Sequence, residues 1–315
     1  MSGGAAPAVS VVVATYNRSR VLRHALASVV ASTLDDWELV VVGDACTDDS
    51  EEVVRSFGDP RVRWENLPAN CGDQSGPNNR GVALARGRSV AFLNHDDVYL
   101  PTHLEKAVAF LDATGADLAW VPALVADPPG EGAEAGGPGR FHLEGVPPAS
   151  GWSPWAFYSA SSWVFRRELA ERVGEWPSPR ECWVTPSQAW LFRAHRAGAD
   201  LRFLPDAGVI VVWSGKRRGS YARAESPEHD ALAMALAADP RFLERAFASA
   251  ALSAASLQVE GVHHRAWKGL GRFLLQPVYS ALSAAGVHPA SLHMMLRHGG
   301  RGGFIRDHRR FTGIR

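Results

Sequence analysis

The sequence has few cysteines and no long apolar run, and these absences exclude several classes of protein. Its three cysteines lie far apart without a Cys-x-x-Cys pair, which argues against a disulfide scaffold and favours a reducing compartment. No uninterrupted apolar segment reaches the roughly 18 residues expected of a membrane span. The opening MSGGAAPAVS lacks the basic start and apolar core of a signal peptide. We therefore expect a soluble, cytoplasmic protein.

A net charge is also absent, because 33 basic residues balance 33 acidic ones. The balance is uneven, since residues 261–315 hold nine Lys and Arg against one acid, Asp307. The remaining, acidic body has no basic stripe, which argues against a nucleic-acid binder. The basic C-terminal segment favours either peripheral contact with the inner face of an anionic membrane or ordinary packing, on the domain or in a homodimer.

Strand-like and helix-like patterns alternate through the first hundred residues. Such alternation is typical of a parallel sheet covered by helices, and in such sheets ligands bind beyond the carboxyl ends of the strands. The predicted strands are 9–15, 37–43, 61–66 and 89–94; the helices between them start after Arg18, at a cap formed by Asp48 with Glu51, and over 77–87.

Polar residues directly follow three of these strands. Residues 15–17 follow the first strand, Asp44 the second, and Asp96 with Asp97 the fourth. The three groups should meet at one sheet edge, which predicts a single site there. Two adjacent carboxylates near a core repel each other unless something compensates them. Either a bound cation or a solvated turn is consistent with this pair.

The second part of the chain has a different character. The Pro- and Gly-rich composition of residues 127–150 predicts a loop. A short strand and a helix that ends near Gly174 are predicted to follow it. A further helix has Thr185 or Ser187 as its cap, and two late strands come after it. From about Pro227 onward the pattern is mainly helical.

Five motifs in order resemble those of family 2 glycosyltransferases of the GT-A fold. They are VSVVVATYNR, LVVVGDACTDDS, NCGDQSGPNNRGVALARG, FLNHDDVYLP and SSWVFRRELAERVGEW, within roughly residues 9–213. Two positions depart from the family pattern, because Gly43 and Asn94 each stand where the family has an acid. The resemblance implies a Rossmann-like, mostly parallel sheet flanked by helices, with a mainly helical C-terminal extension.

The same resemblance implies an organisation and an activity. A glycosyltransferase domain over 1–225 would hold a nucleotide-sugar half, 9–100, and an acceptor half, 101–225, followed by a helical basic region, 226–315. The implied reaction transfers a sugar from a UDP- or dTDP-linked donor to an acceptor hydroxyl, with inversion, in glycan or glycosylated-metabolite biosynthesis. The donor sugar stays open, and so does the acceptor, whether a polysaccharide, a lipid carrier or a small molecule.

The resemblance also implies site residues. A divalent cation, Mn²⁺ or Mg²⁺, would neutralise the diphosphate, with Asp97 as its direct ligand and Asp96 as a second ligand or a contact to the ribose. Asp44 would accept a hydrogen bond from the imide N–H of uracil or thymine. The further nucleotide-sugar candidates are Thr15, Tyr16, Asn17, Arg18, Asn78 and Arg80. Ordinary alternatives stay open: a capped turn for Asp44 and 15–17, and a solvated side chain for Arg80.

The resemblance breaks at the general base. The family places an acid early in the helix that follows its acceptor-side segment, but residues 187–191 read SQAWL, so Ala189 occupies that position and 183–198 contain no acid. Three interpretations stay open. The chain lacks its general base and transfers the sugar poorly, or Glu181 or His195 acts as the general base instead. In the third interpretation the reaction needs no general base. A non-catalytic nucleotide-sugar-binding protein of the same fold is the alternative function.

Two other α/β classes fit the sequence poorly. A sugar nucleotidyltransferase would carry an N-terminal G-x-G-x-R signature, which is absent. A Rossmann oxidoreductase would need G-x-G-x-x-G after the first strand, where VATYNRSR contains no glycine.

Overall fold

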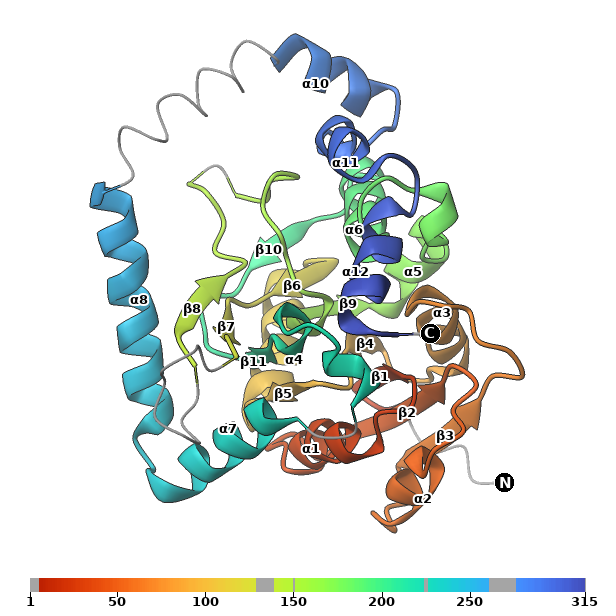
Figure 1. Cartoon of the computed structure of the whole chain (residues 1–315), viewed down its shortest axis with the longest axis vertical. Coiled ribbons are helices and arrows are strands. Elements are labelled where there is room, and N and C mark those ends of the chain that lie inside the picture. Colours follow the sequence, from red (N-terminus) through yellow and green to blue (C-terminus); the bar gives the residue numbers. More distant parts are fainter. Residues whose placement is uncertain (1–5, 129–138, 150, 224–225, 261–275, 315) are drawn as a thin grey trace.

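The computed structural model describes residues 6–128, 139–149, 151–223, 226–260 and 276–314. At its centre is a seven-stranded sheet with the order β10-β6-β9-β4-β1-β2-β3 (Figure 1). Neighbouring strands are parallel except at β9, which is antiparallel to β4 and β6. The predicted α/β fold with a mostly parallel sheet is confirmed. The strands are β1 (Val9–Thr15), β2 (Trp37–Gly43), β3 (Val62–Asn66), β4 (Ser89–Phe92), β6 (Leu118–Trp120), β9 (Trp163–Arg166) and β10 (Leu201–Phe203).

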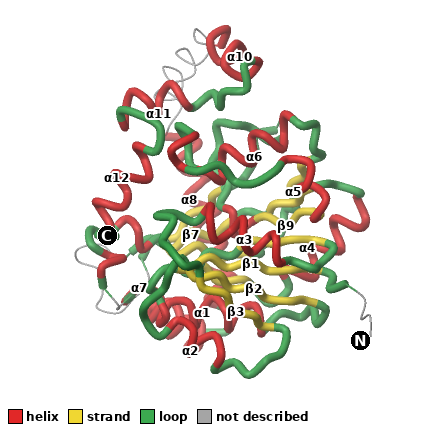
Figure 2. The backbone as a smooth tube through the Cα atoms, turned by 90° about the vertical axis from the view of Figure 1, so that its right-hand side faces the viewer, coloured by secondary structure: helices red, strands yellow, loops and turns green. Residues whose placement is uncertain are grey.

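Helices cover both faces of this sheet (Figure 2). Every residue of β1 and of β2 is buried, as expected for strands packed on both sides. In β1, Val11 and Val13 join the core under α1 (Ser19–Val30) and α4 (His103–Thr114), whereas Val12 joins the core on the opposite face. That second core lies against α3 (Ser75–Leu84), α5 (Arg167–Val173) and α6 (Pro186–Arg196).

A second, four-stranded sheet extends the molecule; of its strands only Val209–Val212 was predicted, as the second of the two late strands. Its order is β5-β11-β7-β8, from β5 (Asp97–Tyr99), β11 (Val209–Val212), β7 (Ala123–Ala126) and β8 (Phe141–Glu144). Strands of three or four residues are too short to show a periodic pattern. The sheet matters for the site because β5 begins at Asp97, so the second carboxylate of the Asp96-Asp97 pair belongs to a buried strand.

Local differences from the predicted helices have simple causes. The third helix ends at Leu84 rather than at Gly87, and a Cβ atom on Gly87 would lie 2.5 Å from the backbone nitrogen of Ser10. The capping box predicted at Asp48 is wrong, because α2 (Ser50–Arg55) has Asp49 at its N-cap position. The carboxylate of Asp48 instead accepts from the N–H of Ser19, at 3.1 Å, and so fastens α1 to the turn after β2. Of the two caps proposed for α6, Thr185 is the one that accepts from the helix backbone.

The helical C-terminal region is present. It comprises α7 (Pro227–Ala238), α8 (Phe242–Glu260), α10 (Gln276–Ala284), α11 (Ser291–His298) and α12 (Gly303–Thr312). Figure 1 shows α8 beside β8, and α12 packs against α11. None of the helices in the described part of the chain is long and apolar enough to cross a membrane. Residues 261–275, part of the segment predicted to contact a membrane, lie outside the described residues. The domain boundary near residue 225 stays a prediction.

Candidate active site

The carboxyl ends of β1 and β2 lie side by side and carry the first two predicted residue groups. Thr15 pairs with Gly43 in the sheet, and the N–H of Asp44 donates to the carbonyl of Thr15 at 2.8 Å. Asn17 adopts a left-handed conformation with φ 48°, and its side-chain oxygen accepts from the N–H of Thr47 at 2.7 Å. Asn17 therefore ties the two strand-end turns together.

The carboxylate of Asp44 is fixed by the loop that follows β3. It accepts from the N–H of Cys71 at 2.7 Å and from the N–H of Gly72 at 3.2 Å. Gly43, where the family has an acid, has no room for a side chain, because a Cβ atom there would lie 2.6 Å from the ring of Trp64. The departure from the family pattern at residue 43 is thus a packing requirement.

Asp44 lies in a cavity of about 120 Å³. Thr15, Tyr16 and Asp73 also line this cavity, which we call the small cavity. Burial, more than any other factor, raises the pKa of Asp73. Its lining residues are Ala14, Thr15, Tyr16, Asp44, Asn70, Gly72, Asp73, Gln74, Pro77, His95, Arg309 and Ile314.

A second cavity of about 550 Å³, the large cavity, adjoins the first, because Tyr16, His95 and Ile314 line both. Arg18 lines the large cavity and is unusual for a charged residue, because it is only 3% exposed. The guanidinium lies 4.6 Å from the ring centroid of Tyr221, and Nη1 donates to a backbone carbonyl at 3.2 Å. Nε and Nη2 are buried and have no hydrogen-bond partner among the described residues. Unpaired donors on a buried charged group are unfavourable, so this pattern makes Arg18 a candidate contact for an anion.

Asp96 is buried and interacts electrostatically with Arg18. Its Oδ2 accepts from the hydroxyl of Tyr221 at 2.8 Å, and its backbone carbonyl is 2.8 Å from Nε2 of His229. Burial raises the pKa of Asp96, but His95, Arg18, His229 and the Tyr221 hydroxyl together outweigh burial and lower it.

Asp97 has the opposite environment. It is 1% exposed, and its two oxygens accept from Asn94 Nδ2 at 2.8 Å, from the Ser161 hydroxyl at 2.5 Å and from the N–H of Val212 at 3.2 Å. Burial, and then the neighbouring Asp96, raise the pKa of Asp97 to about 8. Asn94 stands where the family has an acid, and its amide group donates a hydrogen bond to Asp97. An ionised carboxylate at residue 94 could not donate this bond. Asp97 is engaged within the fold, whereas Asp96 lies beside the guanidinium of Arg18.

Three of the predicted nucleotide-sugar residues, Asn78, Arg80 and Asp96, do not line these cavities. Asn78 is buried in α3, and Arg80 pairs with Glu65 at 2.5 Å on the exposed side of the same helix. The basic loop after β11 is likewise engaged, since Lys216 pairs with Asp127 at 2.6 Å. The binding roles predicted for Asn78 and Arg80 are therefore not supported by their positions and stay predictions.

The region around Ala189 forms a third cavity of about 320 Å³, the acceptor-side cavity. Ala189 lies in the first turns of α6, and Glu181 lines the same cavity, although its carboxylate accepts from the N–H of Ser178 at 2.9 Å. His195, the other predicted substitute, lies in the last turn of α6, where it stacks on Trp152 and does not line this cavity. Of the two substitutes, only Glu181 is close to the expected base position.

No group of three or more His, Cys, Asp or Glu side chains capable of holding a metal ion occurs in the part of the chain that the structure describes. A hard cation that binds a diphosphate needs only one or two protein carboxylates, since phosphate oxygens and water complete its shell. Asp96 fits that requirement.

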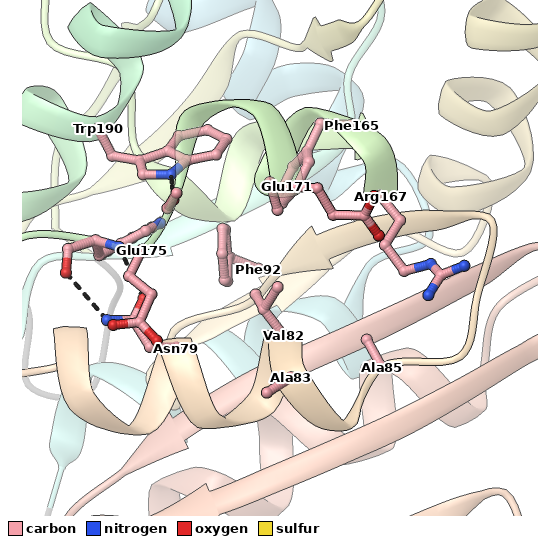
Figure 3. Close-up of a pocket in the computed structure, with 13 residues that line it drawn as sticks. Asn79, Val82, Ala83, Ala85, Phe92, Phe165, Arg167, Glu171, Glu175 and Trp190 are labelled. Carbon is pink, nitrogen blue, oxygen red and sulfur yellow. Dashed lines mark hydrogen bonds between the residues drawn. The ribbon is translucent and has the colours of Figure 1, made fainter.

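A fourth cavity, of about 350 Å³, lies between α3 and α5 (Figure 3). Phe92, Phe165 and Trp190 line it, and Asn79 closes one end through hydrogen bonds to the backbone of Trp176. None of the predicted site residues lines this cavity. It is therefore separate from the sheet edge that carries Thr15, Asp44 and Asp96, which we call the donor edge.

Comparison with known protein families agrees with the geometry. The family model described as glycosyl transferase family 2 matches residues 10–174, just over half of the chain. The chain belongs to glycosyl transferase family 2. Within this family, the matched region contains β1, β2, Asp44, Asp96 and β9, and it ends before α6 and Ala189.

Individual relatives match shorter parts. The succinoglycan biosynthesis protein ExoO of Rhizobium meliloti (strain 1021) is 38% identical over 113 residues, which cover 36% of this chain and 32% of ExoO. The glucosyltransferase WfgD of Escherichia coli, named for UDP-Glc and α-D-GlcNAc-diphosphoundecaprenol, is 29% identical over 103 residues, 33% of this chain and 40% of WfgD. The matches thus span about a third of these curated relatives.

Solved structures of S. aureus TarS 1–349 resemble this GT-A fold. The complex with UDP has a TM-score of 0.53 at 20% identity and covers 97% of this chain and 90% of that chain. The complex with UDP-GlcNAc has the same TM-score at 22% identity, with coverage of 70% and 63%. At this level of identity the likeness establishes the fold.

Sequence reasoning missed three residues of the candidate site. His95 stands inside the FLNHDDVYLP motif but was not assigned a role, although it lines both donor-edge cavities. Tyr221 bonds to Asp96 from 125 residues away, and Arg309 reaches Gly72 from 237 residues away. No local pattern marks either of these two positions.

Proposed function

We propose that the protein binds a UDP- or dTDP-linked sugar and transfers the sugar to an acceptor hydroxyl with inversion. The observation that carries this proposal is the buried Arg18, a residue of the large cavity, whose Nε and Nη2 donors have no hydrogen-bond partner among the described residues and whose charge acts on Asp96. A diphosphate supplies the charged oxygens that these donors require. The adjoining small cavity, next to Asp44, then receives the base.

The charge changes of the reaction fit this arrangement. When the acceptor oxygen attacks C1 of the sugar, the bond from C1 to the phosphate oxygen breaks and the nucleoside diphosphate leaves with the electron pair. Arg18 stabilises negative charge where it develops. A divalent cation, Mn²⁺ or Mg²⁺, supplies further neutralisation when bound. Asp96 is the residue that would hold this cation, because the oxygens of Asp97 accept hydrogen bonds from three groups of the fold.

Asp44 retains the capacity to read the base. Its carboxylate accepts two backbone N–H groups, and an ionised carboxylate offers about four acceptor sites. An imide N–H of uracil or thymine can therefore bind without displacing the loop.

A second candidate function is nucleotide-sugar binding with little or no transfer. One observation favours it, namely the methyl group of Ala189 at the position of the expected base. Inverting transfer must move the acceptor proton to a base, and the expected base is missing. The chain would then bind a nucleotide sugar and transfer it poorly or not at all. Glu181 is the nearest substitute in the acceptor-side cavity, and a reaction without a base is the third option.

The printed names of ExoO and WfgD favour glycan biosynthesis as the process, with a glycan, a lipid-linked saccharide or a small molecule as the acceptor. A cytoplasmic location, contact with the inner membrane face through the basic C-terminal segment, and a homodimer belong to the same proposal.

Calorimetric titration of UDP, dTDP and GDP, with and without Mn²⁺, tests the donor site. We expect UDP or dTDP to bind, and Mn²⁺ to strengthen binding by about tenfold or more, which is roughly 1.4 kcal/mol. The Asp96→Ala variant should lose the Mn²⁺ effect, whereas Asp97→Ala should keep it at temperatures where that variant is folded.

Thermal unfolding of each variant provides the folding control. Loss of the Mn²⁺ effect in a folded Asp97→Ala variant, but not in Asp96→Ala, would identify Asp97 as the metal ligand. Absence of any nucleotide binding by the unmodified chain would show that the resemblance concerns the fold alone.

A further inference from the structure

The last described helix, α12, supplies a charged side chain to the small cavity. Arg309 lines this cavity together with Asp44, and its guanidinium donates to the backbone carbonyl of Gly72. The family match ends at residue 174, far before α12 in the sequence, so it assigns no role to Arg309.

One residue fixes the spacing between Asp44 and Arg309. The N–H of Gly72 donates to the carboxylate of Asp44, while the carbonyl of Gly72 accepts from Arg309. Gly72 has φ 86°, which a side chain disfavours, and a Cβ atom on it would lie 2.5 Å from Nη1 of Arg309. An acceptor and a cationic donor therefore both line the small cavity and both bond to the backbone of Gly72.

α12 is docked firmly enough to position this side chain. The carbonyl of Phe311 accepts from the N–H of Gly219 at 2.9 Å, next to the loop that carries Tyr221. At the other end of the helix, the N–H of Gly302 donates to the carbonyl of Cys182 at 3.1 Å. Thr312 is fully buried. The helix therefore links the acceptor-side cavity to the donor edge.

We propose that Arg309 reads the nucleobase of the donor: it donates to O4 of uracil or thymine while Asp44 accepts from N3–H. The inference rests on the proposed function and adds the residue that decides base specificity. A pyrimidine imide presents one donor between two carbonyl oxygens, so a carboxylate alone leaves the oxygens unpaired in a closed site. The adjacent pair of Asp44 and Arg309 satisfies N3–H and O4 together.

The pair also discriminates between bases. Cytosine carries an amino group at C4 and an acceptor at N3, so both Asp44 and Arg309 would meet a group of the wrong kind. Guanine offers a suitable donor and acceptor edge, but it has two fused rings. The small cavity, at about 120 Å³, is well below the roughly 300–1,000 Å³ of typical ligand sites, and favours a single ring.

Titration of UDP, CDP and GDP in the presence of EDTA, on the full chain, tests the proposal. We expect the unmodified chain to prefer UDP over CDP and GDP. Arg309→Ala should weaken UDP binding about 10–100-fold and reduce the preference over CDP by a similar factor, because it removes a charge-assisted hydrogen bond. Arg309→Lys, which keeps one charged donor, should lose less.

Arg310→Ala is the matched control, since Arg310 is exposed on the same turn of α12. It should change UDP binding by no more than about twofold. Thermal unfolding of each variant checks that α12 remains docked. Equal UDP-to-CDP preference in the unmodified chain and Arg309→Ala would overturn the role of Arg309 while leaving the donor site intact. Failure of the unmodified chain to bind any nucleotide would overturn the proposed function and this inference together.

Discussion

The donor edge and the acceptor-side cavity handle charge in opposite ways. At the donor edge, the carboxylate of Asp44 is held by backbone N–H groups and that of Asp96 by Tyr221, and the buried guanidinium of Arg18 lowers the pKa of Asp96. In the acceptor-side cavity, the expected carboxylate is the methyl group of Ala189, and Glu181 is engaged with its own turn. This difference predicts that variants can change donor binding and acceptor activation separately.

The largest expected effect comes from placing a carboxylate at residue 189, where the general base is expected. We expect Ala189→Asp to raise turnover with the correct acceptor by about 10²–10⁴-fold, the usual contribution of general base catalysis, and to leave UDP affinity nearly unchanged. Steady-state kinetics with UDP release as the readout measure both quantities.

Ala197→Asp is a matched control, because it adds the same charge at the exposed, opposite end of α6. It should not raise turnover. If Ala189→Asp also leaves turnover unchanged, the base-deleted interpretation is wrong, and Glu181→Gln becomes the next variant to examine.

The second prediction concerns pH and the acceptor-side cavity, which contains His288. Burial lowers the pKa of His288 to about 4, whereas the unfolded chain binds a proton near pH 6.5. The stability contributed by neutral His288 is therefore complete above about pH 6.5 and is lost as the pH falls toward 4. At pH 4.5 the loss should be roughly 2–3 kcal/mol.

Urea unfolding of the unmodified chain and of His288→Gln at pH 7 and pH 4.5 measures this effect. The difference between the two proteins isolates His288, because buried His103, whose pKa is also lowered to about 4, is present in both. An identical pH dependence in the two proteins would contradict the prediction.

The third prediction concerns the contribution of Arg18 to diphosphate binding at the donor edge. Arg18→Met should weaken UDP binding about 10–100-fold through the loss of charge-assisted hydrogen bonds to the diphosphate, but it should leave uridine binding almost unchanged. Competition of UDP and uridine against a fluorescent nucleotide, without metal, separates the two effects. Arg23→Met, at an exposed position of the same helix, is the control, and an equal loss for uridine would place Arg18 at the base instead.

Much of the donor edge was predictable because it depends on local patterns. Short runs rich in β-branched residues located β1 and β2, and the ends of parallel strands necessarily share one edge, so Thr15 and Asp44 could be placed together. In the second sheet only β11 was predicted, and the short strand β5, which explains why Asp97 is buried, could not be found this way. The roles of Asp96 and Asp97 look equivalent in the sequence, yet their environments differ.

Residue identity and local periodicity were enough to predict the order of strands and helices through the first hundred residues, the position of the donor edge and the absence of an acid at residue 189. These features follow from residue identity and from periodicity over a few residues. Only the tertiary structure decided that Asp96 lies beside Arg18 while Asp97 is engaged within the fold, and that Arg309 joins Asp44 in the small cavity. The physical reason is that these environments come from chain segments more than sixty residues apart, which burial and hydrogen bonding bring together and which no local pattern records.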